Sequence, residues 1–392
     1  MGEFVAEAVK KSARDDVEHR EVLIIGAGPA GSVAAQRLAE EGVDVLSIER
    51  REIVGNPAQC GECIPNWGEV IAAFDNVEQD PWLRSSFDFP DRVRLARLDW
   101  MRVFSPSMKC WGFELDAFSA HRPQFDGMLA ERATSAGAEI RVGTALRKVQ
   151  KQPKLGRELY RTTNGIYTAD YVIDASGSLA QVARLRRGKD AKFRPSDQIP
   201  TIYAQVEGDL PDTFDVFLGA VAPGGYAWII PKGEVANVGL GVAAGKLGEV
   251  MLKQYLGEFC QKMDFEVLSW GGGWIPMGGP VKRMVDGNVL AVGDAAGLVM
   301  PSNGGGISQA MISAKFAADA ILAHRADGVG LESYEKMVRR SMGKALRISL
   351  RSKRLGNAFL GGDLRTEAMM RILGPIGGLK RAMECKRPLW LF

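Results

Sequence analysis

The order of apolar and polar positions predicts a strand, a helix and a second strand near the start of the chain. The apolar run 21–25 is typical of a buried strand, 32–41 has the spacing of a helix, and 43–48 is a second apolar run. Short runs of the same kind occur at 171–173 and 288–292. Buried strands that alternate with helical segments predict an α/β fold with a parallel, Rossmann-like sheet.

A glycine-rich turn separates the first strand from the first helix. Gly26 allows a tight turn, Gly28 lets the backbone approach a pyrophosphate, and Gly31 lets the helix pack closely on the strand. Free N–H groups at the helix start can bind phosphate oxygens, and Glu49 after the second strand is placed to bind ribose hydroxyls. The predicted dinucleotide site contains Gly26, Gly28, Pro29, Ala30, Gly31, Glu49 and Arg50.

Later segments favour a flavin over other dinucleotides. Asp294 follows a buried strand, where its carboxylate can accept hydrogen bonds from a sugar-alcohol chain. The triple glycine 304–306 precedes a helical pattern over 307–324, whose N-terminus can stabilise negative charge on a reduced ring. Segment 171–177 is a third strand that ends in Asp and Gly. These segments add Asp174, Gly177, Gly293, Asp294, Gly304, Gly305, Gly306 and Ile307 to the predicted cofactor site.

Composition and charge narrow the function classes. The 392 residues are 46% hydrophobic and 25% charged, as in ordinary globular proteins. Because 50 basic residues stand against 47 acidic ones and no reader motif accompanies them, we predict no nucleic-acid binding. No apolar stretch approaches the roughly 20 residues of a spanning helix, and no signal-peptide pattern opens the chain. With an odd number of cysteines, five, we expect a cytoplasmic protein in a reducing compartment.

The order of several motifs resembles a flavoprotein superfamily. The glycine turn 26–31 is followed by Arg-Pro-Gln-Phe-Asp at 122–126, by 174–177 and by the glycine-rich stretch 293–306. This order is similar to that of the p-hydroxybenzoate hydroxylase superfamily, and the similarity covers roughly residues 20–325. The resemblance implies that the cofactor is FAD.

Three shorter segments resemble one family within that superfamily. They are 59–62 (QCGE), 223–233 (PGGYAWIIPKG) and 237–241 (NVGLG). All three look like segments of the geranylgeranyl reductases, especially the archaeal enzymes that saturate digeranylgeranylglycerophospholipids. The substrate that the resemblance implies is a long polyprenyl chain on a lipid.

The resemblance also implies roles for individual residues. It places Glu49 at the adenosine ribose, Arg122 near the flavin linker and Asp294 at ribityl or pyrophosphate oxygens. It places Cys60, with Gly61, close to the isoalloxazine ring. The residues implied to line a lipid tunnel are Tyr226, Trp228 and Pro231, and those implied to carry catalysis are Cys60, Tyr226 and Trp228.

Two positions depart from the family pattern. Ile230 stands where phenylalanine is usual, which changes the shape of the pocket and the prenyl length that it prefers. Cys63 follows Cys60 at C-x-x-C spacing, which leaves the redox partner of Cys60 open.

Several of these residues have simpler interpretations. The spacing of Cys60 and Cys63 occurs in zinc sites, but there is no second pair and the chain has only three histidines, so we predict no metal site. Cys60 is either a redox or acid group or a buried thiol. Tyr226 and Trp228 are either tunnel wall or ordinary core aromatics of a strand. The Gly-Leu-Gly at 239–241 predicts a strand whose glycines leave room for a neighbour.

The C-terminal part interleaves basic and apolar residues. Eight basic residues fall between 336 and 354, and the tail 386–392 adds further basic and aromatic residues. Such a segment suits peripheral contact with an anionic lipid surface, here the inner face of the cell membrane. The alternative is a solvated helix whose apolar side packs on the main body.

The combined expectation is a mixed α/β protein in which an FAD-binding domain is interleaved with an antiparallel-sheet substrate domain, followed by C-terminal helices. The predicted division is an N-terminal arm (1–20), an FAD-binding domain (21–74, 116–184 and 281–330), a substrate domain (75–115 and 185–280) and a C-terminal helical region (331–392).

Reduction of an isolated alkene requires hydride at one carbon and a proton at the other, in a dry tunnel that holds the chain. Cys60 is the leading candidate for the proton donor or for a gate. No clean NAD(P)H site is visible, so we expect an external electron donor, either NAD(P)H or a ferredoxin-like protein. Rival functions are a flavin monooxygenase or halogenase of the same fold, a non-catalytic prenyl-binding protein, and a quinone-linked dehydrogenase.

Overall fold

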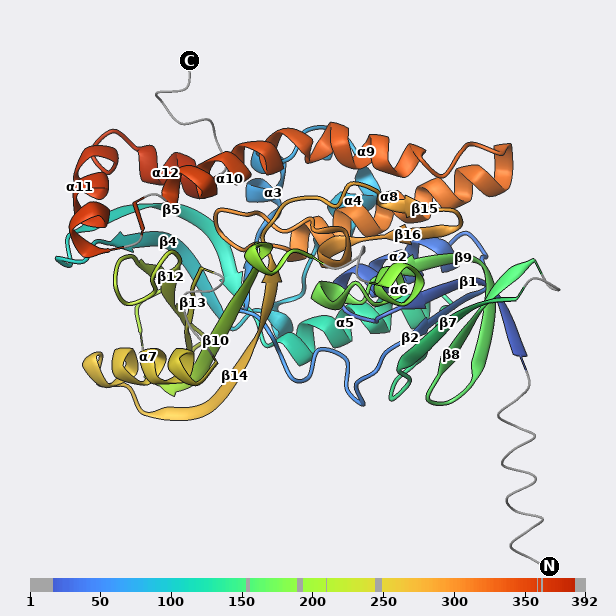
Figure 1. Cartoon of the computed structure of the whole chain (residues 1–392), viewed down its shortest axis with the longest axis horizontal. Helices are drawn as coiled ribbons and strands as arrows, with labels where there is room; N and C mark the ends of the chain where they lie inside the picture. Colours follow the sequence, from blue (N-terminus) through green and yellow to red (C-terminus); the bar gives the residue numbers. More distant parts are fainter. Residues whose placement is uncertain are drawn as a thin grey trace, which may run out of the picture.

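Two eight-stranded sheets lie side by side in the computed structural model of the chain, and helices run along the top of both (Figure 1). The structure describes residues 17–152, 156–188, 193–208, 210–243, 249–357, 359–360 and 362–384. Most of the predicted N-terminal arm and the basic tail 386–392 lie outside these residues.

The first sheet has the parallel core that the apolar runs predict. Its order is β15-β16-β9-β1-β2-β6, with a β7–β8 hairpin continuing from β9. All pairs from β16 to β6 are parallel, and β15 is antiparallel to β16. The strands are β1 (Val17–Ile25), β2 (Val45–Ile48), β6 (Glu139–Arg141), β7 (Leu146–Gln152), β8 (Arg157–Thr162), β9 (Ile166–Asp174), β15 (Val285–Asp286) and β16 (Val289–Ala291). All residues of β2 and β16 are buried, and apart from Ser47 all of them are apolar, as is typical of a strand covered on both faces.

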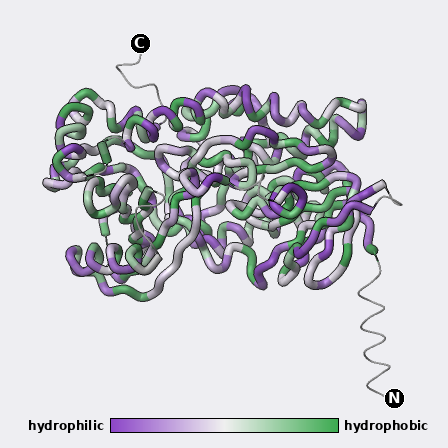
Figure 2. The backbone as a smooth tube through the Cα atoms, in the orientation of Figure 1, coloured by the Kyte–Doolittle hydropathy of each residue, from purple (hydrophilic) through white to green (hydrophobic). Residues whose placement is uncertain are grey.

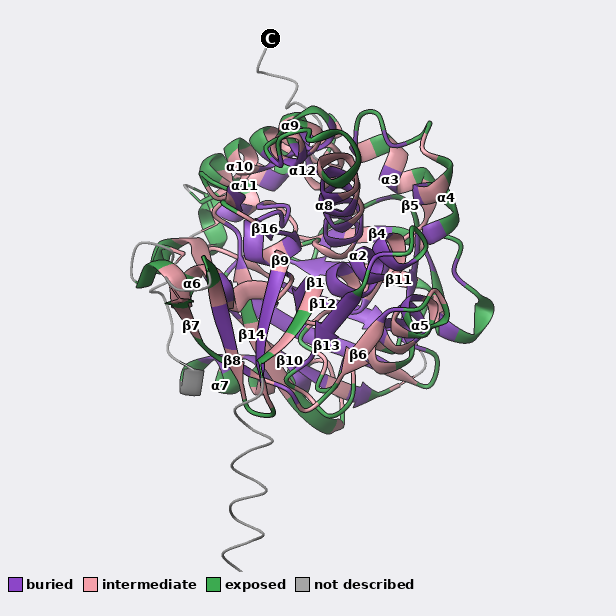
Figure 3. Ribbon diagram, turned by 90° about the vertical axis from the view of Figure 1, so that its right-hand side faces the viewer, coloured by how far each residue is buried: buried purple, intermediate pink, exposed green. Residues whose placement is uncertain are grey.

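Helices cover the first sheet on both faces. Three helices lie on one face: α2 (Pro29–Ala39), α5 (Arg122–Ser135) and α8 (Ile307–Asp327). Both α5 and α8 pack against α2. Their apolar side chains form one core, while α6 (Gln181–Arg187) packs on β7 at the other face. Figure 3 shows the buried strands of this sheet enclosed by these helices.

The second sheet is antiparallel apart from one parallel pair, β4 with β11. Its order is β14-β10-β13-β12-β11-β4-β5-β3. The strands are β3 (Cys63–Pro65), β4 (Ala96–Phe104), β5 (Cys110–Ser119), β10 (Gln198–Glu207), β11 (Thr213–Phe217), β12 (Tyr226–Pro231), β13 (Val235–Gly241) and β14 (Val267–Pro276). Helix α7 (Glu249–Lys262) packs against β10 and β13. Two short helices, α3 (Trp67–Ala73) and α4 (Pro81–Ser86), belong to the connection between β3 and β4.

The C-terminal helices extend from one sheet to the other. They are α9 (Ser333–Ser341), α10 (Gly343–Gly356), α11 (Asp363–Leu373) and α12 (Gly378–Met383). Hydrophilic and hydrophobic segments alternate along them (Figure 2). The apolar residues Val338, Met342 and Leu346 of the basic segment are buried in the same core as α2 and α8. The packing interpretation of this segment is therefore confirmed for α9 and the first turns of α10.

The boundaries differ from the predicted ones in two places. β1 begins at Val17, so residues 17–20 belong to the first strand rather than to an arm, because they pair with 166–169 of β9. β3 and β5 belong to the second sheet, although 63–65 and 116–119 were assigned to the FAD-binding domain. Pairing between strands distant in sequence decides both points, and local apolar patterns do not report it.

Candidate active site

A cavity of about 450 Å³ lies where the parallel strands of the first sheet end. Its wall includes Ile25 at the end of β1, Glu49 after β2 and Ala175 after β9. Ligands of open α/β sheets bind at this edge, beyond the carboxyl ends of the strands. We call this space the dinucleotide cavity.

The three glycines of the turn have the geometry that each predicted role requires. Gly26 has φ +109°, and an added Cβ would lie 2.4 Å from the carbonyl oxygen of Ala175. A Cβ on Gly31 would lie 1.7 Å from the carbonyl oxygen of Gly26, so only glycine fits there. A Cβ on Gly28 would meet nothing within 4 Å, because Gly28 faces the dinucleotide cavity. This open face leaves room for a ligand to approach the N-terminus of α2.

The acidic residue after β2 is held in place by backbone N–H groups. Glu49 is buried, and its carboxylate accepts hydrogen bonds from the N–H of Ala27 at 3.1 Å and of Arg51 at 3.0 Å. Arg50 and Arg51 also line the dinucleotide cavity. Among the described residues, the buried Nε of Arg51 has no hydrogen-bond partner. Arg51, which the sequence analysis missed, therefore has a donor available for a ligand with acceptor oxygens.

The opposite wall of the cavity contains Arg122 and Asp294. Arg122 forms a two-pronged ion pair with Asp126, at 2.9 and 2.7 Å, and also contacts Cys60. Burial lowers the pKa of Arg122, but Asp126 and Cys60 more than reverse the effect and leave this pKa raised. Burial raises the pKa of the Asp294 carboxyl to about 6, and Arg122 opposes that rise. The wall thus combines a fixed cation with a carboxyl that can ionise near neutral pH.

The triple glycine lies at the N-terminus of α8, as predicted. Gly306 is the N-cap residue of α8, and both Gly304 and Gly306 line the dinucleotide cavity together with Ile307. Gly305 faces the neighbouring chamber instead. The free N–H groups of the first helical turn lie at this wall, where they favour negative charge.

Of the remaining predicted cofactor residues, some line the dinucleotide cavity and others lie outside its wall. Pro29, Ala30, Gly61 and Gly177 line the dinucleotide cavity. Gly31, Asp174 and Gly293 lie outside its wall. The carboxylate of Asp174 accepts hydrogen bonds from the backbone of Ser176, Val182 and Ala183, and burial raises its pKa. Asp174 therefore satisfies backbone N–H groups in the first turn of α6, and its contact with the cofactor stays a prediction.

Two further spaces adjoin the dinucleotide cavity. A chamber of about 270 Å³ shares Cys60, Gly61 and Gly304 with it. A larger, mainly apolar cavity of about 780 Å³ shares Tyr226 and Trp228 with the chamber. We call the larger space the apolar tunnel. Neighbouring spaces have wall residues in common, so the tunnel, the chamber and the dinucleotide cavity adjoin one another in that order.

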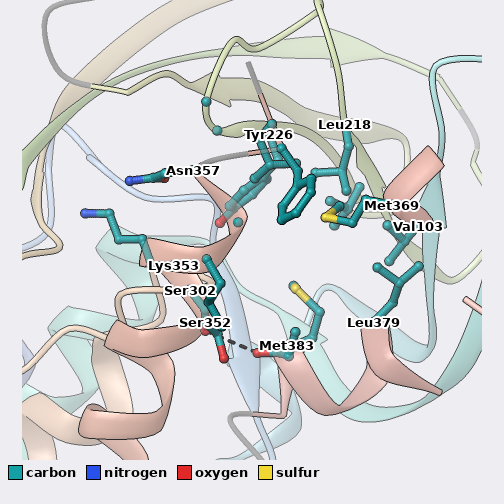
Figure 4. Close-up of a pocket in the computed structure, with 18 of the residues that line it drawn as sticks. Val103, Leu218, Tyr226, Ser302, Ser352, Lys353, Asn357, Met369, Leu379 and Met383 are labelled. Atoms are coloured by element: carbon teal, nitrogen blue, oxygen red, sulfur yellow. Dashed lines mark hydrogen bonds between the residues drawn. The ribbon is translucent and has the colours of Figure 1, made fainter. Parts of the chain in front are cut away.

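The apolar tunnel lies between the second sheet and the C-terminal helices. In Figure 4, Met369, Leu379 and Met383 of these helices lie around the same space as Tyr226 and Leu218. Polar side chains gather in another part of the wall: Ser302, Ser352, Lys353 and Asn357. Pro231 is buried in β12 and lines neither the tunnel nor the chamber. Tyr226 and Trp228 thus combine both interpretations, because they are strand residues that also form a cavity wall.

A buried polar network holds the turn that contains Cys60. The Lys232 ammonium lies 2.6 Å from a carboxylate oxygen of Glu62, and both side chains are at least 96% buried. Asn237 donates to the same oxygen and to the carbonyl of Cys60, and it accepts from the indole of Trp228 at 2.8 Å. Gln205 donates a further hydrogen bond to Glu62 at 3.0 Å. The network links the Cys60 turn to the strand that carries Trp228.

The sequence analysis did not assign a role to Glu62, Lys232 or Asn237. All three lie inside the segments that carry the family resemblance. A charged residue directly after the apolar run 229–231 was the available signal for Lys232. Glu62 has φ +69°, a conformation that non-glycine residues rarely adopt and that its several hydrogen bonds stabilise.

The cysteines of the site are free thiols. Cys60 accepts a hydrogen bond at its sulfur from the N–H of Glu62 at 3.1 Å and lines both the chamber and the dinucleotide cavity. Burial raises the pKa of Cys63 to about 12, and Cys60 adds to this effect. Burial also raises the pKa of Tyr226 well above its ordinary value. In the part of the chain that the structure describes, no group of His, Cys, Asp and Glu side chains could hold a metal ion.

The sequence of the chain is similar to several known protein families. Residues 199–274 match the model of the geranylgeranyl reductase catalytic domain, 24–62 that of an NAD(P)-binding Rossmann-like domain, and 242–371 that of the lycopene cyclase protein. Digeranylgeranylglycerophospholipid reductase 2 of Methanothermobacter thermautotrophicus is 33% identical over 368 residues, which is 90% of this chain and 91% of that protein.

Solved structures of flavoproteins and of one reductase-like protein have a similar fold. A geranylgeranyl bacteriochlorophyll reductase-like protein from Thermoplasma acidophilum superposes with a TM-score of 0.81 and 26% identity, covering 92% of each chain. A flavin-dependent halogenase gives a TM-score of 0.68 and 21% identity, covering 94% of this chain and 72% of the halogenase chain. The second likeness shows a shared fold alone.

Proposed function

The chain belongs to the family of the digeranylgeranylglycerophospholipid reductases, and from this we propose that it saturates the C=C double bonds of geranylgeranyl chains on archaeal-type membrane lipids. It is an FAD-dependent oxidoreductase. The observation that carries the proposal is the apolar tunnel, which adjoins the chamber at Tyr226 and Trp228, while the chamber adjoins the dinucleotide cavity at Cys60.

The residues of the dinucleotide cavity suit FAD. The open face of Gly28 leaves room for the pyrophosphate, the unpartnered Nε of Arg51 offers a donor within the described wall, and Glu49 offers acceptor oxygens near the adenosine end. Asp294 and the N-terminus of α8 would hold the ribityl chain and the flavin ring. Reduced FAD, when bound there, supplies the hydride.

The protein positions the prenyl chain, excludes water from the reacting alkene and donates a proton. Apolar side chains of the tunnel exclude water from an alkene whose two carbons must receive hydride and proton together. The Cys60 thiol is our candidate proton donor, since it lies on the walls of both the chamber and the dinucleotide cavity. Trp228 and Tyr226 hold the prenyl chain at the end of the tunnel.

Two partners complete the proposal. Electrons come from an external donor, NAD(P)H or a ferredoxin-like protein. The lipid substrate brings the enzyme to the inner face of the cell membrane as a peripheral protein. Within the described residues, none of the helices has the length and apolarity needed to cross a bilayer.

The test is anaerobic incubation of the yellow, FAD-loaded protein with a geranylgeranyl lipid and dithionite, followed by mass spectrometry of the lipid. We expect mass gains in steps of two hydrogens. An unchanged lipid from a protein whose flavin reduces and reoxidises normally would refute the substrate assignment. Oxygen-dependent turnover would then favour the monooxygenase or halogenase branch of the fold.

The role of Cys60 has its own test. We expect Cys60→Ser to bind FAD normally and to lose turnover by about 100-fold, as for the removal of a general acid. Flavin reduction by dithionite is the control, because it does not need the proton donor. Full turnover of the FAD-loaded variant would remove Cys60 from the chemistry.

A further inference from the structure

Exposed apolar side chains gather on α11 and its flanks. Leu364 is 89% exposed, Ile372 67% and Ile376 50%, and Leu355 and Phe359 are each close to half exposed. They fall on the end of α10, on the connection between α10 and α11, on α11 and on the turn before α12. Single exposed apolar residues are ordinary, but a cluster of this kind on neighbouring helices marks an interaction surface. We call this surface the apolar rim.

The apolar rim surrounds the outer end of the apolar tunnel. Leu355, Phe359 and Ile372 are exposed to solvent and also line the tunnel. Asn357 and Arg365 likewise line the tunnel and are exposed. The tunnel therefore reaches the surface within the rim. A ligand that entered there would pass from the exposed apolar side chains directly into the apolar interior.

Positive charge accompanies the rim. Between residues 351 and 384 the chain has seven basic and three acidic residues. All three acids have partners within the protein: Asp363 accepts from the N–H of Ala220, Glu367 accepts from Ser107 and Arg371, and Glu384 lies 3.8 Å from Lys380. Arg351 and Arg354 are exposed on α10, next to the rim. The surface thus combines apolar side chains with excess positive charge, as interfacial helices on anionic lipid do.

We propose that the apolar rim docks on an anionic lipid bilayer, so that the apolar tunnel opens directly into the acyl-chain region. The basic side chains of α10 and α11 face the lipid head groups, and Leu364, Ile372 and Ile376 enter the interface. The docking segment overlaps only the end of the amphipathic stretch 336–354 expected from sequence, because Val338, Met342 and Leu346 of that stretch are buried in the core. The identity of the lipid that enters the tunnel rests on the proposed function.

The test measures vesicle binding separately from chemistry. FAD-loaded protein is floated with phosphatidylcholine vesicles that contain or lack phosphatidylglycerol. We expect binding to the anionic vesicles that weakens when salt rises from about 0.1 M to about 1 M, since the screening length falls from ~10 to ~3 Å. Because flotation needs no turnover, it tests docking even if alkene reduction fails.

Two double variants distinguish vesicle binding by the apolar rim from nonspecific binding by exposed apolar side chains elsewhere on the surface. Leu364→Ser with Ile376→Ser removes two exposed side chains that do not line the tunnel, and we expect vesicle binding to fall at least about tenfold. Met251→Ser with Leu268→Ser removes two side chains on α7 and β14 that are about half exposed, as Ile376 is, and we expect no change. Arg351→Glu with Arg354→Glu should abolish the preference for anionic vesicles.

Turnover then connects docking to substrate entry. The rim variant should lose activity on vesicle-embedded lipid but keep it on detergent-dispersed lipid, whereas failure of the proposed function would leave both lipids unchanged with every variant. Equal losses of vesicle binding in the rim and control variants would overturn the proposal. So would a rim variant that keeps its vesicle binding and instead loses self-association, because the occupant would then be a second copy of the chain.

Discussion

The dinucleotide cavity and the apolar tunnel are built in opposite ways. Most of the cavity wall comes from turns that directly follow strands or precede helices, such as 26–30, 49–51 and 304–307. The tunnel wall comes from β4, β12 and the helices α10 to α12, which meet only through long-range packing. A site made of backbone turns has a local sequence signature, whereas a site made of packed side chains does not.

The buried ion pair between the two regions should have the largest effect on stability. Lys232→Met leaves the Glu62 carboxylate buried without its cation, and we expect the free energy of unfolding to fall by about 3–5 kcal/mol. The double variant Glu62→Gln with Lys232→Met should recover most of this loss, since no isolated charge remains. Urea unfolding measures both. A single variant within about 1 kcal/mol of wild type would show that the pair is not structural.

Two glycines of one turn should separate folding from cofactor binding. Gly31→Ala places a methyl group against the backbone of Gly26, so we expect a loss of about 3 kcal/mol in stability. Gly28→Ala meets no protein atom, so the apoprotein should keep its stability while FAD affinity falls about tenfold or more. Thermal unfolding without added FAD and flavin fluorescence titration distinguish the two. Similar stability losses in both variants would contradict the assignment of Gly28 to the ligand.

A glycine of the second sheet should change the tunnel and the chamber more than it changes FAD binding. A Cβ on Gly239 would lie 2.3 Å from the ring of Trp228, so Gly239→Ala should displace the indole at the junction of tunnel and chamber. We expect about a tenfold loss in kcat/KM for the lipid with unchanged FAD affinity. Gly241→Ala, whose nearest contact would be 3.1 Å from a threonine methyl, is the milder control. A matching loss of FAD would show that the two regions are not separable here.

The smallest effect concerns pH. The pKa of Asp294 is raised to about 6, so its carboxyl is mostly protonated at pH 5 and ionised at pH 7.5. An ionised carboxylate is the stronger acceptor for ribityl hydroxyls, so FAD affinity should rise across this window by up to about tenfold. Asp294→Asn should flatten the dependence. Fluorescence titrations of the apoprotein at both pH values give the comparison, and an affinity that falls with pH would reverse the assigned role.

Sequence reasoning located the dinucleotide cavity because Gly26, Gly28 and Glu49 have fixed spacing in one short segment. It could not separate Asp174 from Glu49, since both follow buried strands. What differs is that Glu49 lines the dinucleotide cavity, whereas Asp174 lies outside its wall and accepts hydrogen bonds from the first turn of α6. Glu62 and Lys232 are 170 residues apart, and β11, β4 and β5 separate β12 from β3 in the second sheet, so their pairing depends on the tertiary arrangement of that sheet. The family resemblance implied the aromatic residues of the apolar tunnel, but the helices that form its other side are known only from the packing in the structure.

The position of α11 and α12 against the second sheet has a consequence for engineering. These two short helices share an apolar cluster with β4, β5 and β11, and they form one side of the tunnel while the sheet forms the other. None of their residues lines the dinucleotide cavity. We therefore expect that replacing α11 (363–373) with the matching helix of a relative changes the accepted chain length and leaves the flavin chemistry the same, since α12 keeps its hydrogen bonds to Ser302 and Asn303 next to the glycines before α8.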